Sequence, residues 1–376
     1  MGLSIDEYWY WFVNINGVGR ITRNKLLNHF GSVVEVYNCS ETVIKNMEFL
    51  NEKQKNNILV KNSDGIKHDY LAMMKKGISF IHQDSVDFPE KLMDIPDKPH
   101  GLYCKGEYKK ILEDNRFKVA IVGSRKCSAY GNEAAYKIGY ELGARGICVV
   151  SGMARGIDGA AEKGCLNAGG NSAAVLGCGV DICYPGDNID LYMNIARNGV
   201  LISENNPGTK PAAGLFPERN RLISGLADAI IVVEAGEKSG TFITVDMALE
   251  QGKEVYALPG RITDLQSRGC NRLIKQGAQI FESVTEFLND MESFQACRGM
   301  NNETYKMFYD MKIDEKRPKQ QEQNIIYSIL DMKPKHIDDI VKETGIALCH
   351  VMNHLIDMEI NGIVRKTVNN YYVLNI

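Results

Sequence analysis

The chain has 376 residues, 44% of them apolar, which predicts a folded protein of two or three domains rather than a disordered chain. Its net charge of −3 excludes a polycationic binder of the histone type but leaves room for a local basic groove. The ten cysteines form no Cys-x-x-Cys pair, which excludes zinc-ribbon and redox-motif sites, and no stretch approaches the roughly 20 apolar residues of a membrane helix. Asp6 and Glu7 stand where a signal peptide would be basic, so we expect a soluble, cytoplasmic protein with reduced thiols.

Residues 1–75 have helical patterning, interrupted by the turn Ile15-Asn-Gly-Val-Gly-Arg20. A hydrophobic-x-Gly-x-Gly turn before a Leu-rich and Phe-rich helix is typical of a helix-hairpin-helix, which offers backbone amides to a phosphate. A plain tight turn in a small helical domain explains the same pattern, because Asn16 replaces the usual proline. Both interpretations stay open. The proline-containing stretch 76–115 predicts an extended connector packed on the next domain.

Residues 116–290 alternate short apolar runs with helical stretches. We expect strands at 119–122, 147–150, 173–176, 200–203, 229–234, 255–258 and 278–281. An alternation of strand and helix predicts a doubly wound, mostly parallel α/β sheet.

The remainder of the chain changes character twice. Residues 291–321 are polar and irregular, which predicts a linker. Helical patterns follow at 322–331, 337–344 and 347–361, and a hairpin is expected from 363–366 and 371–374. Three helices and a hairpin in this order predict a winged helix at 322–376. Winged helices bind nucleic acid or protein, and Arg365 and Lys366 alone do not decide between them.

Three loops of the central region follow predicted strands and suit an anion. They read Gly123-Ser-Arg-Lys126, Ser151-Gly-Met-Ala-Arg-Gly-Ile-Asp158 and Ser239-Gly-Thr241. In a parallel sheet, the loops after the strands share one edge, where ligands bind. Exposed amides at helix N-termini, glycines and arginines together describe an anion site at that edge.

Two ligand classes are disfavoured by the residues at this edge. Gly123-Ser-Arg is no dinucleotide fingerprint, and Ser151-Gly152 stand where an acidic residue would hold the ribose. No P-loop motif is present. Residues 116–290 contain no histidine, so a hydrolase would need a carboxylate as its general base. The available carboxylates each have a structural use, and we expect no catalysis from them: Asp158, Glu204, Glu234 and Asp246.

A nucleic-acid backbone fits the same edge better. Arginine suits bidentate phosphate contacts, and the basic residues expected there are Arg125, Lys126, Arg155, Arg219, Arg221 and Lys238. Phe216 could stack on an unpaired base, or instead pack in the core beneath its loop; Tyr184 is a second, weaker stacking candidate. A basic groove with one or two aromatic rings is the single-strand arrangement.

The motifs together resemble the DNA-processing protein A (DprA, also called Smf) family, in order and in spacing. The matching stretches read Ala120-Ile-Val-Gly-Ser-Arg125, Ser151-Gly-Met-Ala-Arg-Gly-Ile-Asp158, Ala174-Val-Leu-Gly-Cys-Gly179, Tyr184-Pro-Gly, Ile202-Ser-Glu204, Phe216-Pro-Glu-Arg-Asn-Arg221, Ser239-Gly-Thr241, Ala257-Leu-Pro-Gly260 and Gly269-Cys-Asn-Arg-Leu-Ile274. The resemblance covers nearly the whole chain. It implies an extended Rossmann domain that holds single-stranded DNA, an N-terminal helical domain of SAM or helix-hairpin-helix type, and a C-terminal winged helix.

The resemblance also implies which residues bind DNA. The predicted residues are Gly123, Ser124, Arg125, Ser151, Gly152, Arg155, Gly156, Phe216, Arg219, Asn220, Arg221, Ser239, Gly240 and Thr241. Glu162 departs from the family, which usually has histidine there. A negative charge at this position would weaken phosphate binding if it faced the pocket.

The function implied is that of a non-enzymatic mediator. It would protect incoming single strands, load the RecA recombinase during natural transformation and form a homodimer through the Rossmann domain, with neither cofactor nor metal. The alternative is a nucleoside-monophosphate phosphoribohydrolase on the same scaffold. Those enzymes carry Pro-Gly-Gly-x-Gly-Thr-x-x-Glu, whereas Thr244 stands here at the position of the catalytic glutamate.

Overall fold

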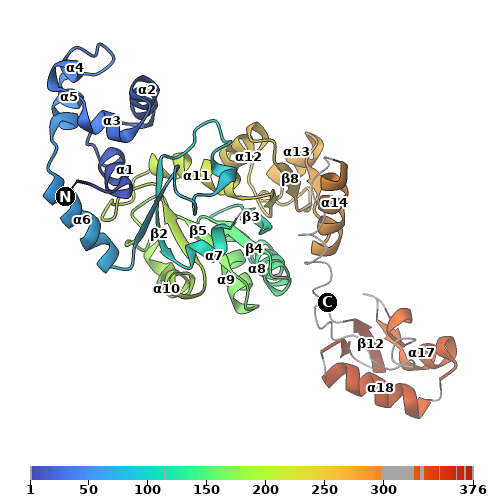
Figure 1. Cartoon of the computed structure of the whole chain (residues 1–376). Coiled ribbons are helices and arrows are strands. Elements are labelled where there is room, and N and C mark those ends of the chain that lie inside the picture. Colours follow the sequence, from blue (N-terminus) through green and yellow to red (C-terminus); the bar gives the residue numbers. More distant parts are fainter. Residues whose placement is uncertain are drawn as a thin grey trace. The chain divides into compact units, whose positions relative to one another are not determined.

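The structure is a computed structural model that describes residues 2–113, 116–297, 326–330, 334–346, 348–360, 362–367 and 370–374. It divides into two compact units, Met1–Asp310 and Met311–Ile376. The first unit combines the N-terminal helices with a large sheet, and the second is small (Figure 1).

The N-terminal region of the first unit is helical, as the patterning predicted. Its helices are α1 (Ile5–Val13), α2 (Arg20–Phe30), α3 (Val33–Asn38), α4 (Glu41–Lys45), α5 (Glu52–Leu59) and α6 (Ser63–Lys75). They contribute the buried side chains Trp9, Phe12, Leu26, Ile44 and Ile58 to a core that also includes Phe80 and Tyr103 from the sheet region. The helical region therefore packs directly against the sheet region, with which it shares its buried apolar core.

The Gly-x-Gly turn joins α1 to α2. Gly17 takes a positive φ of 73°, which side-chain-bearing residues rarely adopt. The amide of Asn57 donates a hydrogen bond to the carbonyl of Asn16, and that of Gln54 donates to the carbonyl of Gly17. The turn is thus held by α5. Whether it is a helix-hairpin-helix or a plain turn stays a prediction.

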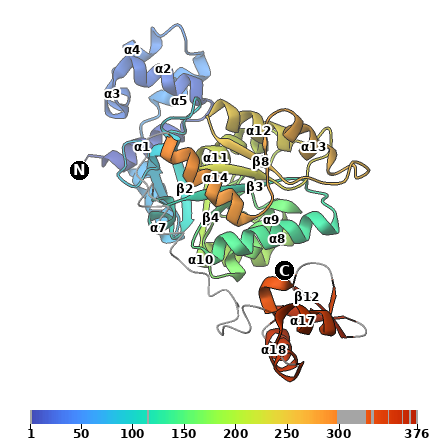
Figure 2. The same ribbon diagram turned by 90° about the vertical axis from the view of Figure 1, so that its right-hand side faces the viewer.

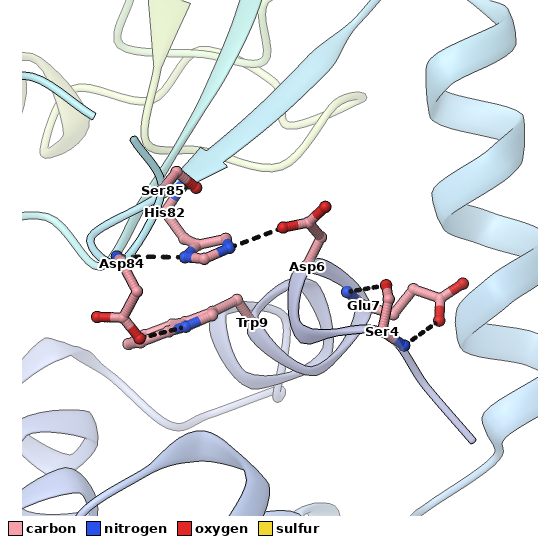
Figure 3. Close-up of polar contacts among 7 residues, drawn as sticks. All are labelled: Ser4, Asp6, Glu7, Trp9, His82, Asp84 and Ser85. Atoms are coloured by element: carbon pink, nitrogen blue, oxygen red, sulfur yellow. Dashed lines mark hydrogen bonds and ion pairs between the residues drawn. The ribbon is translucent and has the colours of Figure 1, made fainter. Parts of the chain in front are cut away.

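Helix α1 is attached to the strand β1 (Ser79–His82) by the contacts in Figure 3. Nε2 of the buried His82 lies 2.9 Å from a carboxylate oxygen of Asp6. The indole of Trp9 donates to Asp84 at 2.9 Å and stacks on the His82 ring, with centroids 5.3 Å apart. These polar contacts, made over an apolar interface, bind the helical region to the sheet.

The described residues of the first unit form a nine-stranded sheet in the order β1-β2-β6-β5-β4-β3-β7-β8-β9. Strand β2 (Gly101–Gly106) is antiparallel to β1 and to β6, so the stretch 76–115, expected as an extended connector, supplies two strands of the sheet. The other strands pair in parallel: β3 (Lys118–Val122), β4 (Cys148–Ser151), β5 (Ser172–Val175), β6 (Val200–Ser203), β7 (Ala229–Val232), β8 (Glu254–Ala257) and β9 (Gln279–Ile280). The predicted mostly parallel α/β fold is confirmed.

Helices cover both faces of the parallel part (Figures 1 and 2). One face packs on α11 (Leu215–Leu226), α12 (Thr241–Glu250) and α13 (Arg268–Lys275), and the other packs on α8 (Ala129–Ala144), α9 (Ile157–Asn167) and α14 (Val284–Cys297). Strand β3 contributes side chains to both cores. Ala120 and Val122 belong to the first, while Val119 and Ile121 belong to the second. The central strands are apolar throughout because successive side chains point to opposite, equally buried faces.

The linker predicted at 291–321 begins inside α14, which extends to Cys297. Most of that prediction, and the start of the helical pattern at 322–331, lie outside the described residues. In the second unit, the described residues form α17 (Ile337–Thr344), α18 (Leu348–Ile360) and an antiparallel sheet in the order β10-β12-β11. The strands are β10 (Lys335–His336), β11 (Val364–Lys366) and β12 (Tyr371–Leu374). These elements fall where helices and a hairpin were expected, and the winged-helix assignment stays a prediction.

Candidate functional site

A pocket of about 720 Å³ opens at the carboxyl ends of β3 and β7. These neighbouring strands mark the place where the chain order along the sheet reverses, since β4, β5 and β6 lie to one side of β3 and β7, β8 and β9 to the other. Loops diverge at such a switch point and leave a crevice for a ligand. The predicted residues that line it are Gly123, Ser124, Arg125, Phe216, Arg219, Asn220, Ser239, Gly240 and Thr241.

The loop after β3 is held in place by backbone contacts and by one carboxylate. The amide of Ser124 donates to the carbonyl of Glu234 at 2.7 Å. A Cβ on Gly123 would stand 2.8 Å from that same carbonyl oxygen, so only glycine fits there. The Glu234 carboxylate accepts hydrogen bonds from the amide of Ser128 at 2.8 Å and from its hydroxyl at 2.5 Å. Glu234 therefore fixes this loop.

The pocket rim, defined here as Arg125 and Lys126, is exposed. The guanidinium of Arg125 lies 5.3 Å from the centre of the Phe216 ring, a cation–π contact. Arg125 and Lys126 form no ion pair with any residue that the structure describes. The rim thus presents two positive charges to solvent beside an aromatic ring.

The pocket floor, defined here as Arg219 and Asp158, is buried. Arg219 is only 6% exposed, and its guanidinium donates to the carbonyls of Gly152, at 2.9 Å, and Val175. A Cβ on Gly152 would lie 2.6 Å from the guanidinium nitrogens. Burial lowers the pKa of Arg219, while Asp158 opposes that shift. Arg219 therefore ties α11 to the ends of β4 and β5, which leaves it little capacity for a phosphate.

Two carboxyl groups, Asp158 and Glu162, lie one turn apart on α9. Burial raises the pKa of Asp158, and the Arg219 guanidinium opposes this shift. Glu162 is fully buried, and burial, helped by the nearby Asp158, holds its pKa well above the ordinary value. Within the described residues, no hydrogen bond of ordinary geometry reaches its carboxyl oxygens, although the nearby backbone of Met153 favours the charged form. Glu162 does not line the pocket, so it presents no charge to a phosphate there.

Residues predicted from the loop after β4 do not line the pocket. The hydroxyl of Ser151 is buried and donates to the carbonyl of Ile121 at 2.6 Å. Gly156 packs against the loop after β3, because a Cβ there would lie 2.4 Å from the carbonyl oxygen of Ser124. The exposed Arg155 pairs with Asp187 at 2.5 Å. This loop therefore supports the residues that line the pocket: Gly156 packs against the loop after β3, and Gly152 packs against Arg219.

Arg221 also lies away from the pocket. It is 4% exposed and pairs with Glu204 at 2.6 Å. A helix turns by about 100° per residue, so positions 219 and 221 point to opposite sides of α11. The sequence predicted that Arg219 and Arg221 both follow a strand, but it did not predict which side of the helix each side chain would occupy.

Further lining residues lie outside the DNA-binding set that the resemblance implied, although Lys126 and Tyr184 were expected from the sequence as a basic residue of this edge and as a stacking candidate. They are Val122, Lys126, Ala154, Asp158, Tyr184, Pro211, Ala212, Ala213, Pro217, Ile223, Ile243, Thr244 and Gln266. Gln266 comes from the loop after β8, and its amide donates to the carbonyl of Lys126 at 3.0 Å. The position of Gln266 could have been predicted from the sequence, because its loop follows a predicted parallel strand and therefore reaches the same edge of the sheet.

Within the described ranges, no helix is long and apolar enough to cross a bilayer. Nor does any group of three or more His, Cys, Asp or Glu side chains in those ranges have the arrangement of a metal site. The pocket is lined by hydroxyls, side-chain amides and a basic rim. This set of groups suits an anionic, hydrogen-bonding ligand.

Comparison with known proteins gives a consistent result. A family model described as DNA recombination-mediator protein A matches residues 79–292. Protein Smf of Synechocystis is 33% identical over 290 residues, which are 77% of this chain and 73% of that protein. DNA processing protein DprA of Bacillus subtilis is 39% identical over 220 residues, which are 58% of this chain and 73% of that protein.

Two solved structures are similar as well. The X-ray structure of DNA processing protein A from Streptococcus pneumoniae gives a TM-score of 0.67 at 30% identity and covers 77% of this chain and 98% of that one. A Helicobacter pylori DNA processing protein A structure, described in terms of its single-stranded DNA binding mode, gives 0.52 at 30% identity. It covers 60% of this chain and 97% of that one. The family resemblance seen in the motifs is confirmed.

Proposed function

Because this chain belongs to the DNA recombination-mediator protein A family, we propose that it binds single-stranded DNA in the pocket between β3 and β7. Bound strands would be protected and passed to the RecA recombinase during DNA uptake. The similar Helicobacter pylori protein is described as binding single-stranded DNA, which supports this ligand. We place the protein in the cytoplasm, where this DNA is processed.

One observation carries the proposal: the rim arginine and lysine are exposed at the sheet's switch point, in a pocket whose lining includes an aromatic ring open to solvent, that of Tyr184. The charged groups of a nucleic-acid backbone repeat along the strand, so a ligand of this kind engages exposed cations. The aromatic ring is useful to a ligand whose base faces are free, as they are in a single strand. Duplex DNA hides those faces.

We propose that the protein is not an enzyme. Glu234 already accepts two hydrogen bonds from Ser128 and so is not placed as a free base. Thr244, at the position of the glutamate in phosphoribohydrolases, is buried at 3% exposure. We expect incubation with AMP to release no adenine. Release of adenine would support the alternative, a nucleoside-monophosphate phosphoribohydrolase.

The proposed mediator acts as a homodimer through its central domain and contacts RecA. Light scattering coupled to size-exclusion chromatography tests whether the protein is a dimer. Co-elution of the protein with RecA on oligo-dT tests the contact with RecA. Deletion of residues beyond 320 separates a contribution of the C-terminal unit from that of the pocket.

Fluorescence anisotropy of labelled oligo-dT and a matched duplex, at several salt concentrations, tests the ligand. We expect tighter binding to the single strand and an affinity that falls steeply with salt, because counterions are released from the phosphates. Arg125→Glu should abolish most of this binding. Arg197→Glu is the matched control, since Arg197 is exposed at the end of α10 (Ile189–Asn198), before β6 and hence at the opposite edge of the sheet. Preference for duplex, or equal effects of both substitutions, would contradict the proposal.

A further inference from the structure

Tyr184, rather than Phe216, is the aromatic residue whose surroundings leave it available to a ligand. Both rings line the pocket and lie 5.4 Å apart, with an angle of 33° between their planes. Tyr184 is 43% exposed, whereas Phe216 is partly buried. The two rings therefore differ in what they can still contact.

Phe216 is occupied by protein groups. A Cβ on Gly177 would lie 2.8 Å from its ring, so the ring rests directly against the backbone there. The guanidiniums of Arg125 and Arg219 lie 5.3 and 6.0 Å from its centre. With Tyr184 beside it as well, Phe216 has little surface left on which a base could stack.

The segment that leads to Tyr184 is held by hydrogen bonds within itself and to residues 208 and 209. The amide of Ile182 donates to the carbonyl of Gly179 at 3.0 Å, and the amide of Gly179 donates to the carbonyl of Thr209 at 2.9 Å. The carboxylate of Asp181 accepts from the amide of Gly208 at 2.8 Å. A ring held on such a segment loses little conformational freedom when a ligand binds.

We propose that Tyr184 is the residue on which a nucleobase of the bound single strand stacks, with Phe216 as the ring that supports it from the protein side. The rim cations bind the phosphates, and Tyr184 binds a base face. This inference rests on the proposed function. The inference adds that base stacking contributes part of the affinity for the single strand. This contribution does not depend on the base sequence, because every base has a π-face.

The experiment compares two ligands on the full-length chain: labelled oligo-dT and an oligomer of the same length made of abasic deoxyribose phosphates. Wild type should prefer oligo-dT. Tyr184→Leu should weaken binding to oligo-dT by roughly tenfold, the usual effect of losing one stacked base, and leave binding to the abasic oligomer unchanged. Tyr140→Leu is the matched control, because Tyr140 is 45% exposed but lies on α8 and does not line the pocket.

Tyr184→Trp provides a second, independent measurement. It should retain affinity for oligo-dT, and stacking should quench its fluorescence. The background is low, since the natural tryptophans Trp9 and Trp11 are both buried in the N-terminal helical core.

The outcomes separate the two proposals. If wild type binds neither oligomer, the proposed function fails and this inference fails with it. If wild type binds oligo-dT but Tyr184→Leu binds it equally well, and Tyr184→Trp shows no quenching, the single-strand function stands and the assignment of Tyr184 is overturned. Equal losses on both oligomers would also overturn it, because the substitution would then act on the phosphate contacts.

Discussion

The rim and the floor of the pocket both contain an arginine, and the two arginines have opposite surroundings. Arg125 at the rim is exposed, and its guanidinium contacts an aromatic ring. Arg219 in the floor is 6% exposed and donates to backbone carbonyls at the ends of two strands. The same side chain therefore offers a charge to a ligand at one position and joins a helix to the sheet at the other. Both guanidiniums lie near the same Phe216 ring, at 5.3 and 6.0 Å from its centre, so the difference comes from how deeply each arginine is buried.

The largest expected effect comes from Arg219→Ala. This change leaves the carbonyls of Gly152 and Val175 unpaired and removes the charge that opposes the raised pKa values of Asp158 and Glu162. We expect a loss of roughly 3 kcal/mol in the free energy of unfolding, as is usual when a buried charge loses its partners. Urea denaturation followed by circular dichroism measures it. A loss below about 0.5 kcal/mol would mean that the floor arginine is not structural.

A smaller effect, of opposite sign, is expected from Glu162→Gln. The folded-state pKa of Glu162 lies above its ordinary value of 4.5, because burial and Asp158 disfavour the charged form. The contribution of Glu162 to stability is therefore fully present below pH 4.5 and is lost as the pH rises toward its folded-state pKa. Glutamine does not ionise, so the substitution should stabilise the protein by roughly 1–3 kcal/mol at pH 8 and by less at pH 5.

Thermal melts at both pH values measure this difference. Glu133→Gln is the control, because Glu133 is an exposed residue of α8 that pairs with Lys137. Equal changes for the two variants, or a benefit of Glu162→Gln that does not grow with pH, would show that Glu162 is not neutral in the folded protein.

The smallest effect on stability is expected from Arg125→Ala at the rim. An exposed residue that forms no ion pair with the described residues contributes less than about 0.5 kcal/mol to folding. The same substitution should weaken oligo-dT binding and lower the slope of log affinity against log salt by about 0.7, the value for one phosphate contact on a single strand. Anisotropy titrations at four salt concentrations measure the slope. If Arg125→Ala lowered the free energy of unfolding and left the salt slope unchanged, Arg125 would be a structural residue like Arg219, and the contrast between rim and floor would be wrong.

The sequence by itself determined the parallel sheet and the edge at which the pocket lies. Runs such as Val119–Val122 are apolar at every position, which predicts strands buried on both faces. The ends of the observed parallel strands differ from the predicted ends by no more than two residues. The loops after these strands had to share an edge, so Gly123, Ser124 and Thr241 could be brought together from the chain order alone.

Only the tertiary structure decided which members of a motif face the pocket. Arg219 and Arg221 belong to one motif and yet point to opposite sides of α11, and Ser151 and Gly156 are used for packing. Strands β1 and β2 were not expected, because β2 pairs with β6, about a hundred residues further along the chain, and β1 joins the sheet only through β2. The burial of Glu162 and the exposure of Tyr184 likewise depend on elements that meet only after folding. Local patterns fix which segments become strands and helices, whereas the environment of each side chain is set by residues distant in sequence.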